Sequence, residues 1–409
     1  MKILALNCGS STVKFQLFET SLDLIRNGQD RALAQGLVER IGSALARVRC
    51  GREGEPPVAF ERDIPDHQRA IETVFECLLD PGHGALSELA EIDGVGHRMV
   101  HAGEHFSGSV MITTEVARRI EECIDLAPLH NPHNLRGYQA VRALLPDCPN
   151  AGVFDTAFHQ TMPARAYLYA LPYELYRDQR IRRYGFHGTS HRYVCQRYAE
   201  IHGSGPEQYK LISCHLGSGA SICAIDGGRS VDTSLGFTPL EGLVMGTRAG
   251  DVDPGILLDL MARQQITVEE VTEMLNRRSG LLGISGLSND MRELITASRN
   301  GNERARLAID VFCYRVKKYI GSYYAVLNGA DAVIFTGGIG ENSPEVREWC
   351  CEGLEALGIR INPVANTACA GSESQVGAGE TAVWAIPTNE ELLIARDTVR
   401  LISEDRRKD

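Results

Sequence analysis

Alternating apolar and polar positions mark the N-terminus and recur near the middle of the chain. Residues 2–18 read KILALNCGSSTVKFQLF, with alternating apolar positions on both sides of a polar Gly-Ser segment. Such alternation is typical of strands, and glycine and serine favour turns. This segment therefore predicts a β-hairpin with a polar tip.

Residues 210–225, KLISCHLGSGASICAI, repeat the pattern. Aligning the two tips places residues 7–11, NCGSS, over residues 215–219, HLGSG. A repeat separated by about half the chain is too long for a solenoid, so it indicates internal duplication. We expect an α/β fold of two related domains that face each other, with a ligand cleft between them.

A third segment, residues 332–346, reads AVIFTGGIGENSPEV. It predicts a buried strand, a glycine turn and a helix, with Ser343 as the N-cap and Pro344 in the first turn. Its glycines do not match the spacing of dinucleotide-binding loops, so a nicotinamide cofactor is not indicated. An adenosine pocket is the better interpretation.

The C-terminal segment predicts a strand at residues 382–386 followed by a helix from residue 390 to about residue 403. Thr388 and Glu391 have the Thr-x-x-Glu spacing of a capping box. In that arrangement the Glu391 side chain turns back to the backbone and leaves Glu390 directed toward the cleft.

Composition limits the classes of protein that fit. The 409 residues are 43% hydrophobic and 23% charged, which is typical of a soluble globular chain of two or three domains. The net charge of −11 opposes a broad phosphate-binding surface, so no nucleic-acid partner is expected.

Cysteine usage and hydropathy indicate a compartment. The twelve cysteines show no Cys-x-x-Cys spacing and include the adjacent pair Cys350 and Cys351, which favours a reducing cytoplasm over a disulfide framework. The first apolar run stops at Asn7, too early for a signal peptide, and no run reaches membrane-spanning length. We therefore expect a cytoplasmic protein without a membrane partner.

The hairpin tips carry candidate phosphate ligands. Asn7, Ser10, Ser11, Thr12 and Lys14 surround a glycine, so backbone N–H groups, hydroxyls and one cation could converge on a phosphate. The alternative is a solvated turn with Lys14 exposed on an edge strand. The duplicate tip, whose two glycines permit close backbone approach, favours the phosphate interpretation.

The chain resembles the acetate kinase family, within the superfamily of sugar kinases, actin and heat-shock chaperone ATPases. The resemblance spans nearly the whole chain and has small departures at Thr12, Ser218 and Ala102, of which only the one at Ser218 could alter nucleotide contacts. The matching stretches are NCGSSTVKF, HRMVHAGE, PLHNPHN, VFDTAFHQTMP, YGFHGTSH, CHLGSG, DTSLGFTPLEGLVMGTRAGDVDPG, GLLGISGLSNDMRE, FTGGIGEN and PTNEELLIARDT.

The resemblance implies duplicated ribonuclease H-like domains, the actin-like ATPase architecture. The expected domains are residues 1–154, completed by the C-terminal helix at about 388–409, and residues 155–387. It also implies a homodimer and domain closure about hinges near residue 155 and the C-terminal helix. The implied reaction is reversible, direct in-line transfer of the terminal phosphoryl group of ATP to acetate, giving acetyl phosphate and ADP.

Two alternatives remain. Propionate kinase differs by one methylene in the acyl group, which a small apolar pocket discriminates by only about 1 to 3 kcal/mol. Valine at position 100 favours acetate. A non-catalytic nucleotide-binding scaffold of the same superfamily is the second alternative.

Joining two anions requires cations that screen their repulsion. Alternation puts Arg98 on the same face as Val100, and Arg248 lies in a flexible glycine loop. The alternative for each arginine is surface ion pairing. By resemblance both are catalytic and bind substrate, His187 stabilises the transition state, and His130 assists substrate binding.

Mg²⁺, or alternatively Mn²⁺, is the implied metal, and it needs hard oxygen ligands. Asn7 and Glu390 are the candidate ligands, with Asp155 as a catalytic residue near the metal; the alternative for Asp155 is a buried structural acid. His97, His101 and His105 have helical spacing, but Gly103 and strand alternation disfavour zinc there.

The remaining site residues come from the resemblance, although Asp290 could instead be a helix N-cap. The acyl pocket comprises Val100, Leu129, His130, Phe186 and Pro239. The nucleotide site comprises Ser10, Ser11, Thr12, Lys14, His215, Leu216, Gly217, Ser218, Gly219, Asp290, Met291, Arg292, Gly337, Gly338, Ile339, Gly340 and Glu341.

Overall fold

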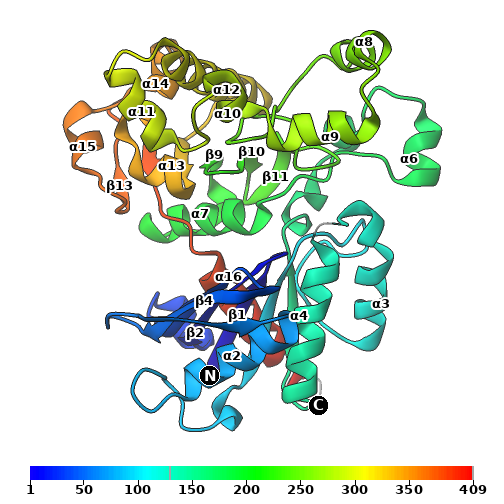
Figure 1. The fold of residues 1–409 in the computed structure, drawn as a ribbon. Helices are drawn as coiled ribbons and strands as arrows, with labels where there is room; N and C mark the ends of the chain where they lie inside the picture. Colours follow the sequence, from blue (N-terminus) through cyan, green and yellow to red (C-terminus); the bar gives the residue numbers. More distant parts are fainter. Residues whose placement is uncertain (129, 408–409) are drawn as a thin grey trace. The chain divides into compact units, whose positions relative to one another are not determined.

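A computed structural model describes residues 1–128 and 130–407. The chain forms two compact units, Met1–Phe158 with Asn389–Asp409, and His159–Thr388. Each unit contains one mixed β-sheet with helices packed on it (Figure 1). The sequence predicts domain boundaries after residues 154 and 387, close to the boundaries between these units. That each unit is an actin-like ATPase domain stays a prediction.

The first unit contains an eight-stranded sheet of order β5-β4-β3-β2-β1-β6-β8-β7. Strands β1, β6 and β8 are parallel to one another, and the other neighbouring pairs are antiparallel. The strands are β1 Lys2–Cys8, β2 Thr12–Glu19, β3 Arg31–Glu39, β4 Ser43–Arg52, β5 Val58–Ile64, β6 Gly94–Met99, β7 Val110–Met111 and β8 Asn150–Phe154.

The second unit contains a six-stranded sheet of order β11-β10-β9-β12-β14-β13. Strands β9, β12 and β14 are parallel, and the remaining pairs are antiparallel. The strands are β9 Lys210–Leu216, β10 Ala220–Asp226, β11 Arg229–Thr233, β12 Ala332–Thr336, β13 Ser374–Gln375 and β14 Ala382–Ala385.

The two sheets share one topology. In both, a three-stranded antiparallel meander is followed by two strands parallel to the first, in the orders β3-β2-β1-β6-β8 and β11-β10-β9-β12-β14. Both predicted hairpins are confirmed, and their tips correspond, because Cys8 pairs with Val13 and Leu216 with Ala220. The internal duplication read from the sequence is therefore present in the fold.

Helices cover both faces of the first sheet (Figure 1). Alternate residues of β1 point to opposite faces: Leu4 and Leu6 join the core with α2 and α4, and Ile3 and Ala5 pack with Ile394 of α16. The helices of this unit are α1 Leu22–Arg26, α2 His67–Leu79, α3 Thr114–Glu122, α4 Asn131–Leu144 and α16 Glu390–Asp405.

In the second unit the long helix α12 packs on β9 and β10, and α7 packs on β9. Every residue of β12 is buried, as its continuous apolar run predicts. The helices are α5 Ala164–Tyr167, α6 Tyr173–Gln179, α7 Gly188–Ile201, α8 Pro254–Gln264, α9 Val268–Arg277, α10 Gly280–Ser285, α11 Met291–Arg299, α12 Glu303–Leu327, α13 Gly337–Asn342, α14 Pro344–Cys351 and α15 Pro363–Ala368.

Two local expectations need correction. The segment after β12 is a short helix, α13, instead of an open glycine turn; Ser343 then caps α14, as predicted. The capping box at the C-terminal helix is wrong. Asn389 is the N-cap and accepts from the Leu392 N–H, because the helix begins one residue later than the Thr-x-x-Glu spacing requires.

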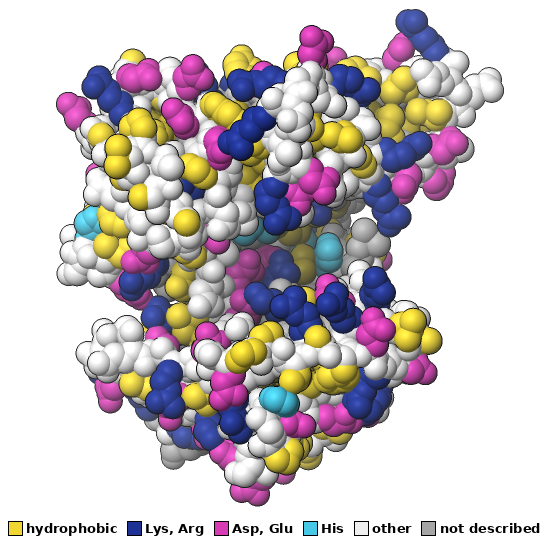
Figure 2. All heavy atoms as spheres, turned by 60° about the vertical axis from the view of Figure 1, so that its left-hand side comes forward, with side chains coloured by type: hydrophobic (Ala, Val, Ile, Leu, Met, Phe, Trp, Pro, Cys, Tyr) yellow, Lys and Arg dark blue, Asp and Glu magenta, His cyan; other side chains and the backbone are white. Residues whose placement is uncertain are grey.

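Surface charge and thiol chemistry agree with the composition. Acidic and basic side chains are interspersed on the face of each unit that Figure 2 shows. All twelve cysteines are free thiols, and eleven of them are buried. None of the helices within residues 1–128 and 130–407 has both the length and the apolar character needed to span a bilayer.

Candidate functional site

The tip of the first hairpin is a tight turn. The Gly9 N–H donates to the Thr12 carbonyl at 2.8 Å. Ser10 and Ser11 are exposed, as phosphate ligands need to be. The His67 Nε2 lies 2.7 Å from the Gly9 carbonyl, a support that sequence reasoning missed because His67 comes from α2, far along the chain.

Lys14 and Asn7 face each other across the hairpin, as paired residues of β1 and β2. The Lys14 ammonium forms an ion pair of 2.8 Å with Glu391, the second residue of α16. The Glu391 carboxylate is thus paired with a cation, and it does not close the helix cap. Sequence spacing could not reveal this pair, because it joins the two ends of the chain.

Arg98, at the end of β6, is the centre of a polar cluster in the first unit. Its Nε and Nη2 donate to the two oxygens of Asp155 at 3.1 and 2.5 Å. Its Nη1 donates to the Asn7 Oδ1 at 3.1 Å, and its Nε lies 3.6 Å from the Glu390 carboxylate. Four predicted site residues, Asn7, Arg98, Asp155 and Glu390, are therefore brought together.

Charges in this cluster perturb one another. Burial lowers the pKa of Arg98, but the charges of Asp155 and Glu390 outweigh burial and raise it above its ordinary value. Burial raises the pKa of Glu390 to about 7, against the opposing charge of Arg98. The cluster contains the carboxyls of residues 155, 390 and 391 and the cations of residues 14 and 98. Its acidic groups outnumber its cations, so a bound cation would balance the charge.

Val100 is buried and follows β6 directly, where its N–H donates to the Asn134 Oδ1 at 3.0 Å. Asn134 also donates from Nδ2 to the Cys8 carbonyl at 2.7 Å, which ties the first hairpin to this segment. His130 precedes α4 and is half-buried. Leu129, the neighbouring pocket prediction, lies outside the described residues.

The three histidines with helical spacing lie in a strand and the loop after it. His97 is buried with Nε2 2.7 Å from the Asn150 Oδ1, and the His101 Nδ1 accepts from the Gly103 N–H at 2.9 Å. His105 contacts Arg119. Across residues 1–128 and 130–407, no three His, Cys, Asp or Glu side chains form a metal-binding group.

In the second unit, a cavity of about 560 Å³ lies beside the second hairpin tip. Seven predicted nucleotide ligands line it. Asp290, one of them, also caps α11, which is the alternative interpretation, and its contact with a nucleotide stays a prediction. The lining residues are Gly217, Ser218, Asn289, Asp290, Met291, Arg292, Ile295, Thr296, Arg299, Gly338, Ile339, Asn342, Ser343 and Glu345.

Gly219 brings the tip against two proposed catalytic side chains. A Cβ built there would lie 3.4 Å from the His187 Nε2 and 3.8 Å from the Arg248 Nη1. The imidazole of His187 stacks on that of His215, with centroids 4.4 Å apart. His187, His215, Gly219 and Arg248 therefore border one region of this unit.

His187 has an unusual backbone, with φ of 56° at the start of α7. Non-glycine residues in this region are strained, and such strain is concentrated at functional sites. Its Nδ1 lies 2.9 Å from the Ser221 Oγ, which also contacts the His191 Nε2 at 2.8 Å. The sequence pattern missed Ser221 because it lies on β10 as an ordinary buried strand residue.

Other predicted nucleotide ligands have structural contacts and lie outside the cavity lining. Leu216 is fully buried in β9. The Glu341 carboxylate accepts from the N–H groups of Gly337 and Thr388 at 2.8 and 2.9 Å, which fixes the start of α13 to the segment before α16. Gly337 has a φ of +76°, and its built Cβ would meet the Leu216 carbonyl at 2.7 Å, so a side chain is excluded there.

Phe186, Pro239 and Arg248 are the remaining site predictions in the second unit. Phe186 is buried, and its carbonyl lies 3.0 Å from the His159 Nε2. The Arg248 Nη1 donates to the Pro239 carbonyl at 2.9 Å, and burial lowers the pKa of Arg248. Arg248 is therefore a partly desolvated cation held in a loop, not a surface ion pair.

Comparisons with known proteins cover nearly the whole chain. The profile of the Acetokinase family matches residues 2–396. An "Acetate kinase" of Dictyoglomus turgidum is 52% identical over 406 residues, which are 99% of this chain and 98% of the relative. One from Alkaliphilus metalliredigens is 54% identical over 404 residues, or 98% and 100% of the two chains.

Solved structures agree. The crystal structure of Porphyromonas gingivalis acetate kinase superposes with a TM-score of 0.93 at 47% identity, covering 98% of this chain and 99% of that one. A propionate kinase from Francisella tularensis superposes with a TM-score of 0.89 at 41% identity and the same coverage. The α/β fold expected from the sequence is thus confirmed.

Proposed function

The chain belongs to the acetokinase family, and we propose that it catalyses the reversible transfer of the terminal phosphoryl group of ATP to acetate. A carboxylate oxygen of acetate attacks the γ-phosphorus, and the bond from that phosphorus to the bridging oxygen breaks. The products are acetyl phosphate and ADP. The transfer is direct, so it inverts configuration at phosphorus and forms no phosphoenzyme.

The Arg98 cluster is the observation that carries this proposal. A guanidinium gives the carboxylate substrate a cationic partner with two parallel donors. Arg98 lies beside Asn7, Asp155 and Glu390, so the cation and oxygen ligands come together in one place. Buried Val100 follows closely in the chain and suits a methyl group.

Mg²⁺, or Mn²⁺ in its place, fits the same cluster. Its donors are carboxylate and amide oxygens, the hard ligands that Mg²⁺ prefers, and acidic groups outnumber cations there. Asn7 and Glu390 would hold the ion, with Asp155 close to them. The bound ion would supply positive charge that screens the repulsion between phosphate and carboxylate.

The second unit supplies the proposed contacts to the nucleoside. The cavity beside Gly217 and Ser218 takes the nucleoside, with Asp290 and Arg292 at its wall. The other proposed nucleotide ligands are residues 215–219 and 337–341 of the second unit and the hairpin residues Ser10, Ser11, Thr12 and Lys14 of the first unit.

His187 and Arg248 stabilise the transferring group in this proposal. The developing charge lies on the equatorial oxygens of a metaphosphate-like group, which accept hydrogen bonds. Replacing Arg98, His187 or Arg248 with alanine should lower turnover by orders of magnitude while the fold stays intact. Circular dichroism and steady-state rates check this, and near-normal turnover would refute the assignment.

A coupled trapping assay tests the reaction itself. ATP, Mg²⁺ and hydroxylamine are incubated with acetate, propionate or butyrate, because hydroxylamine converts an acyl phosphate to a coloured hydroxamate. We expect strong product with acetate and weaker product with propionate. Propionate above acetate would favour the second candidate function, which the similarity to a propionate kinase structure supports. If no acid gives a hydroxamate, the proposed kinase reaction is refuted, and the non-catalytic nucleotide-binding scaffold is the remaining alternative.

Assembly and location complete the proposal. We place the protein in the cytoplasm as a homodimer, without nucleic-acid or membrane partners. The unpaired thiols support a reducing compartment. Ile256, Leu258 and Val268 are at least half exposed on α8 and α9, and such apolar surface supports association. Light scattering coupled to size exclusion measures the assembly directly.

A further inference from the structure

The segment between β11 and α8, residues 234–253, contains neither helix nor strand, and we call it the arginine loop. It carries Pro239 and Arg248, both proposed to bind substrate. Long irregular segments inside compact domains are usually functional, and their backbone polar groups need partners. The side chains that provide these partners therefore control where Arg248 lies.

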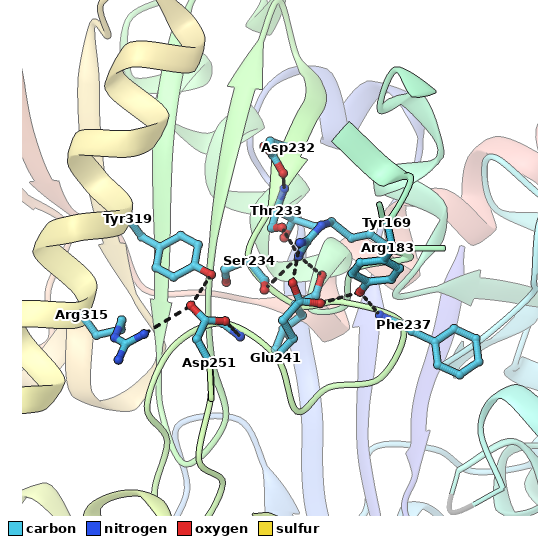
Figure 3. A network of polar contacts seen from close by, with 12 residues as sticks. Tyr169, Arg183, Asp232, Thr233, Ser234, Phe237, Glu241, Asp251, Arg315 and Tyr319 are labelled. Atoms are coloured by element: carbon cyan, nitrogen blue, oxygen red, sulfur yellow. Dashed lines mark hydrogen bonds and ion pairs between the residues drawn. The ribbon is translucent and has the colours of Figure 1, made fainter. Parts of the chain in front are cut away.

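Arg183 braces the beginning of the arginine loop (Figure 3). Its Nη1 donates to the carbonyls of Thr233, Ser234 and Leu235 at 3.0, 3.1 and 3.2 Å. Its Nη2 donates to the Glu241 carboxylate at 2.5 Å. One guanidinium thus fixes three successive carbonyls and a side chain six residues farther along.

Tyr169 provides the second contact to Glu241. Its hydroxyl donates to the Glu241 Oε2 and accepts from the Phe237 N–H at 2.8 Å (Figure 3). Burial raises the pKa of Tyr169, so the hydroxyl keeps its proton and can donate. Both oxygens of Glu241 are therefore held by side chains from outside the arginine loop.

Asp251 fixes the C-terminal end of the arginine loop. Its Oδ1 accepts from the Gly242 N–H at 2.8 Å, and its own N–H donates to the Gly242 carbonyl at 2.9 Å. The Tyr319 hydroxyl, on α12, donates to the Asp251 Oδ2 at 2.9 Å. Residues 242–251, which include Arg248, form a loop with joined ends anchored to α12 (Figure 3).

The contact between Arg248 and Pro239 links the hydrogen bonds around Glu241 to the proposed catalytic arginine. The Arg248 Nη1 donates to the Pro239 carbonyl, and Pro239 precedes Glu241 by two residues. A shift of Glu241 would displace the Pro239 carbonyl, and the guanidinium that donates to this carbonyl would then lose its present orientation. Misplacement of a catalytic group by about 1 Å can lower a rate about 100-fold.

We propose that Glu241, held by Arg183 and Tyr169, is a positioning residue that sets the orientation of the Arg248 guanidinium. The inference rests on the proposed function and extends it to three residues that do not touch the substrate. It differs from a purely structural role because its effect on rate must pass through Arg248.

The first test removes the negative charge of Glu241 and keeps the shape of its side chain. In Glu241→Gln, kcat with acetate should fall about 10- to 100-fold, while the KM for ATP changes less than about twofold. The matched control is Glu373→Gln, because Glu373 pairs with Arg197 at 2.7 Å and its side chain is 32% exposed, like that of Glu241. The control should retain its wild-type rate. Equal losses in both variants, or a wild-type rate in Glu241→Gln, would overturn the inference.

A double-mutant cycle with Arg248→Ala separates the possible failures. If Glu241 acts through Arg248, adding Glu241→Gln to Arg248→Ala causes no further loss. A full additional loss in the double variant refutes the positioning role and leaves the proposed function intact. A near-normal rate for Arg248→Ala refutes the proposed role of Arg248 itself.

Tyr169→Phe keeps the inference testable if Glu241→Gln does not fold. It removes one hydrogen bond to Glu241 and leaves the ion pair with Arg183 in place. We expect a loss of about three- to tenfold in kcat, again absent when Arg248 is alanine. A loss that persists in the Arg248→Ala background would contradict the inference.

Discussion

Arg98 shows how a single residue depends on its neighbours. Three of its nitrogens donate to Asp155 and Asn7, so the orientation of the guanidinium is fixed before substrate arrives. Preorganised donors need little reorientation during reaction, which is the main source of electrostatic catalysis. In the proposed reaction Asp155, only 1% exposed, would therefore act through the cation that it holds.

Replacing Asp155 with asparagine should uncouple this pair. The amide keeps one acceptor oxygen but loses the charge and the two-point contact, so Arg98 becomes free to turn. We expect kcat/KM for acetate to fall at least about tenfold, because a charged hydrogen bond contributes about 1.5 to 3 kcal/mol. Steady-state kinetics with acetate varied at saturating ATP measure it. An unchanged kcat/KM would show that Asp155 is only a structural acid.

His97 gives a pH dependence of stability. Burial lowers its pKa to about 4, against the contact with Asn150, so it stays neutral in the folded chain while the unfolded chain binds a proton below pH 6.5. Stability is therefore present above pH 6.5 and is lost as pH falls from 6.5 toward 4, by about 3 kcal/mol in full.

The His97→Gln variant should lose less stability than the wild type between pH 7 and 5. Hydrogen exchange of peptides from β6, followed at several pH values in the metal-free protein, measures the difference. Parallel stability curves for the two proteins over this interval would contradict the assignment to His97. His202→Gln, in the second unit, is a control that should leave exchange in β6 unchanged.

At the scale of elements, the N-cap of helix α16 lies directly before two residues of the candidate site. Asn389 accepts from the Leu392 N–H at 2.9 Å, and the next two residues, Glu390 and Glu391, reach Arg98 and Lys14. The cap thus fixes the first turn of the helix, from which both carboxylates project.

Asn389→Ala should lower the free energy of unfolding by about 1 kcal/mol, the usual loss for an N-cap. Asn389→Ser retains a capping oxygen and should cost much less. Urea denaturation of the two variants compares them. If the serine variant is destabilised as much as the alanine variant, Asn389 does not act as the cap.

Elements with strong local signals were predictable from sequence. Strand β2 alternates apolar and polar residues, β1 has a short apolar run, and Ser343 with Pro344 marks the start of α14. The cap of α16 was not predictable, because Thr388, Asn389 and Glu391 allow two registers and tertiary contacts of Glu391 select one. Similarly, His67, Ser221 and Arg183 support the proposed site from distant parts of the chain, so no local pattern identifies them.

At the scale of the molecule, the C-terminal helix packs on the first sheet. β6 makes this close approach possible because it has glycines where α16 crosses it. A Cβ built at Gly96 would lie 2.4 Å from the Thr398 Oγ1 and 2.5 Å from the Ile394 Cγ2. These distances are too short for any side chain at the present spacing.

Gly96→Val should therefore push α16 away from the sheet. Overpacking of this kind costs about 1 to 3 kcal/mol. We expect faster hydrogen exchange in β1, β6 and α16, reduced kinase activity because Glu390 moves, and unchanged exchange in β12 of the second unit. Gly108→Ala is the control, since a Cβ there meets nothing within 4 Å. Unaltered exchange in α16 would show that the sheet adapts to the larger residue.

The packing of α16 on β1 also sets an order for folding on the ribosome. Ile3 and Ala5 of β1 are covered by Ile394 and its neighbours, which follow the whole of the second unit in the sequence. The second unit is one uninterrupted stretch of the sequence. All of its residues therefore leave the ribosome before α16 can cover its face of the first sheet. The unit that begins earlier in the sequence is therefore the one whose core is completed later.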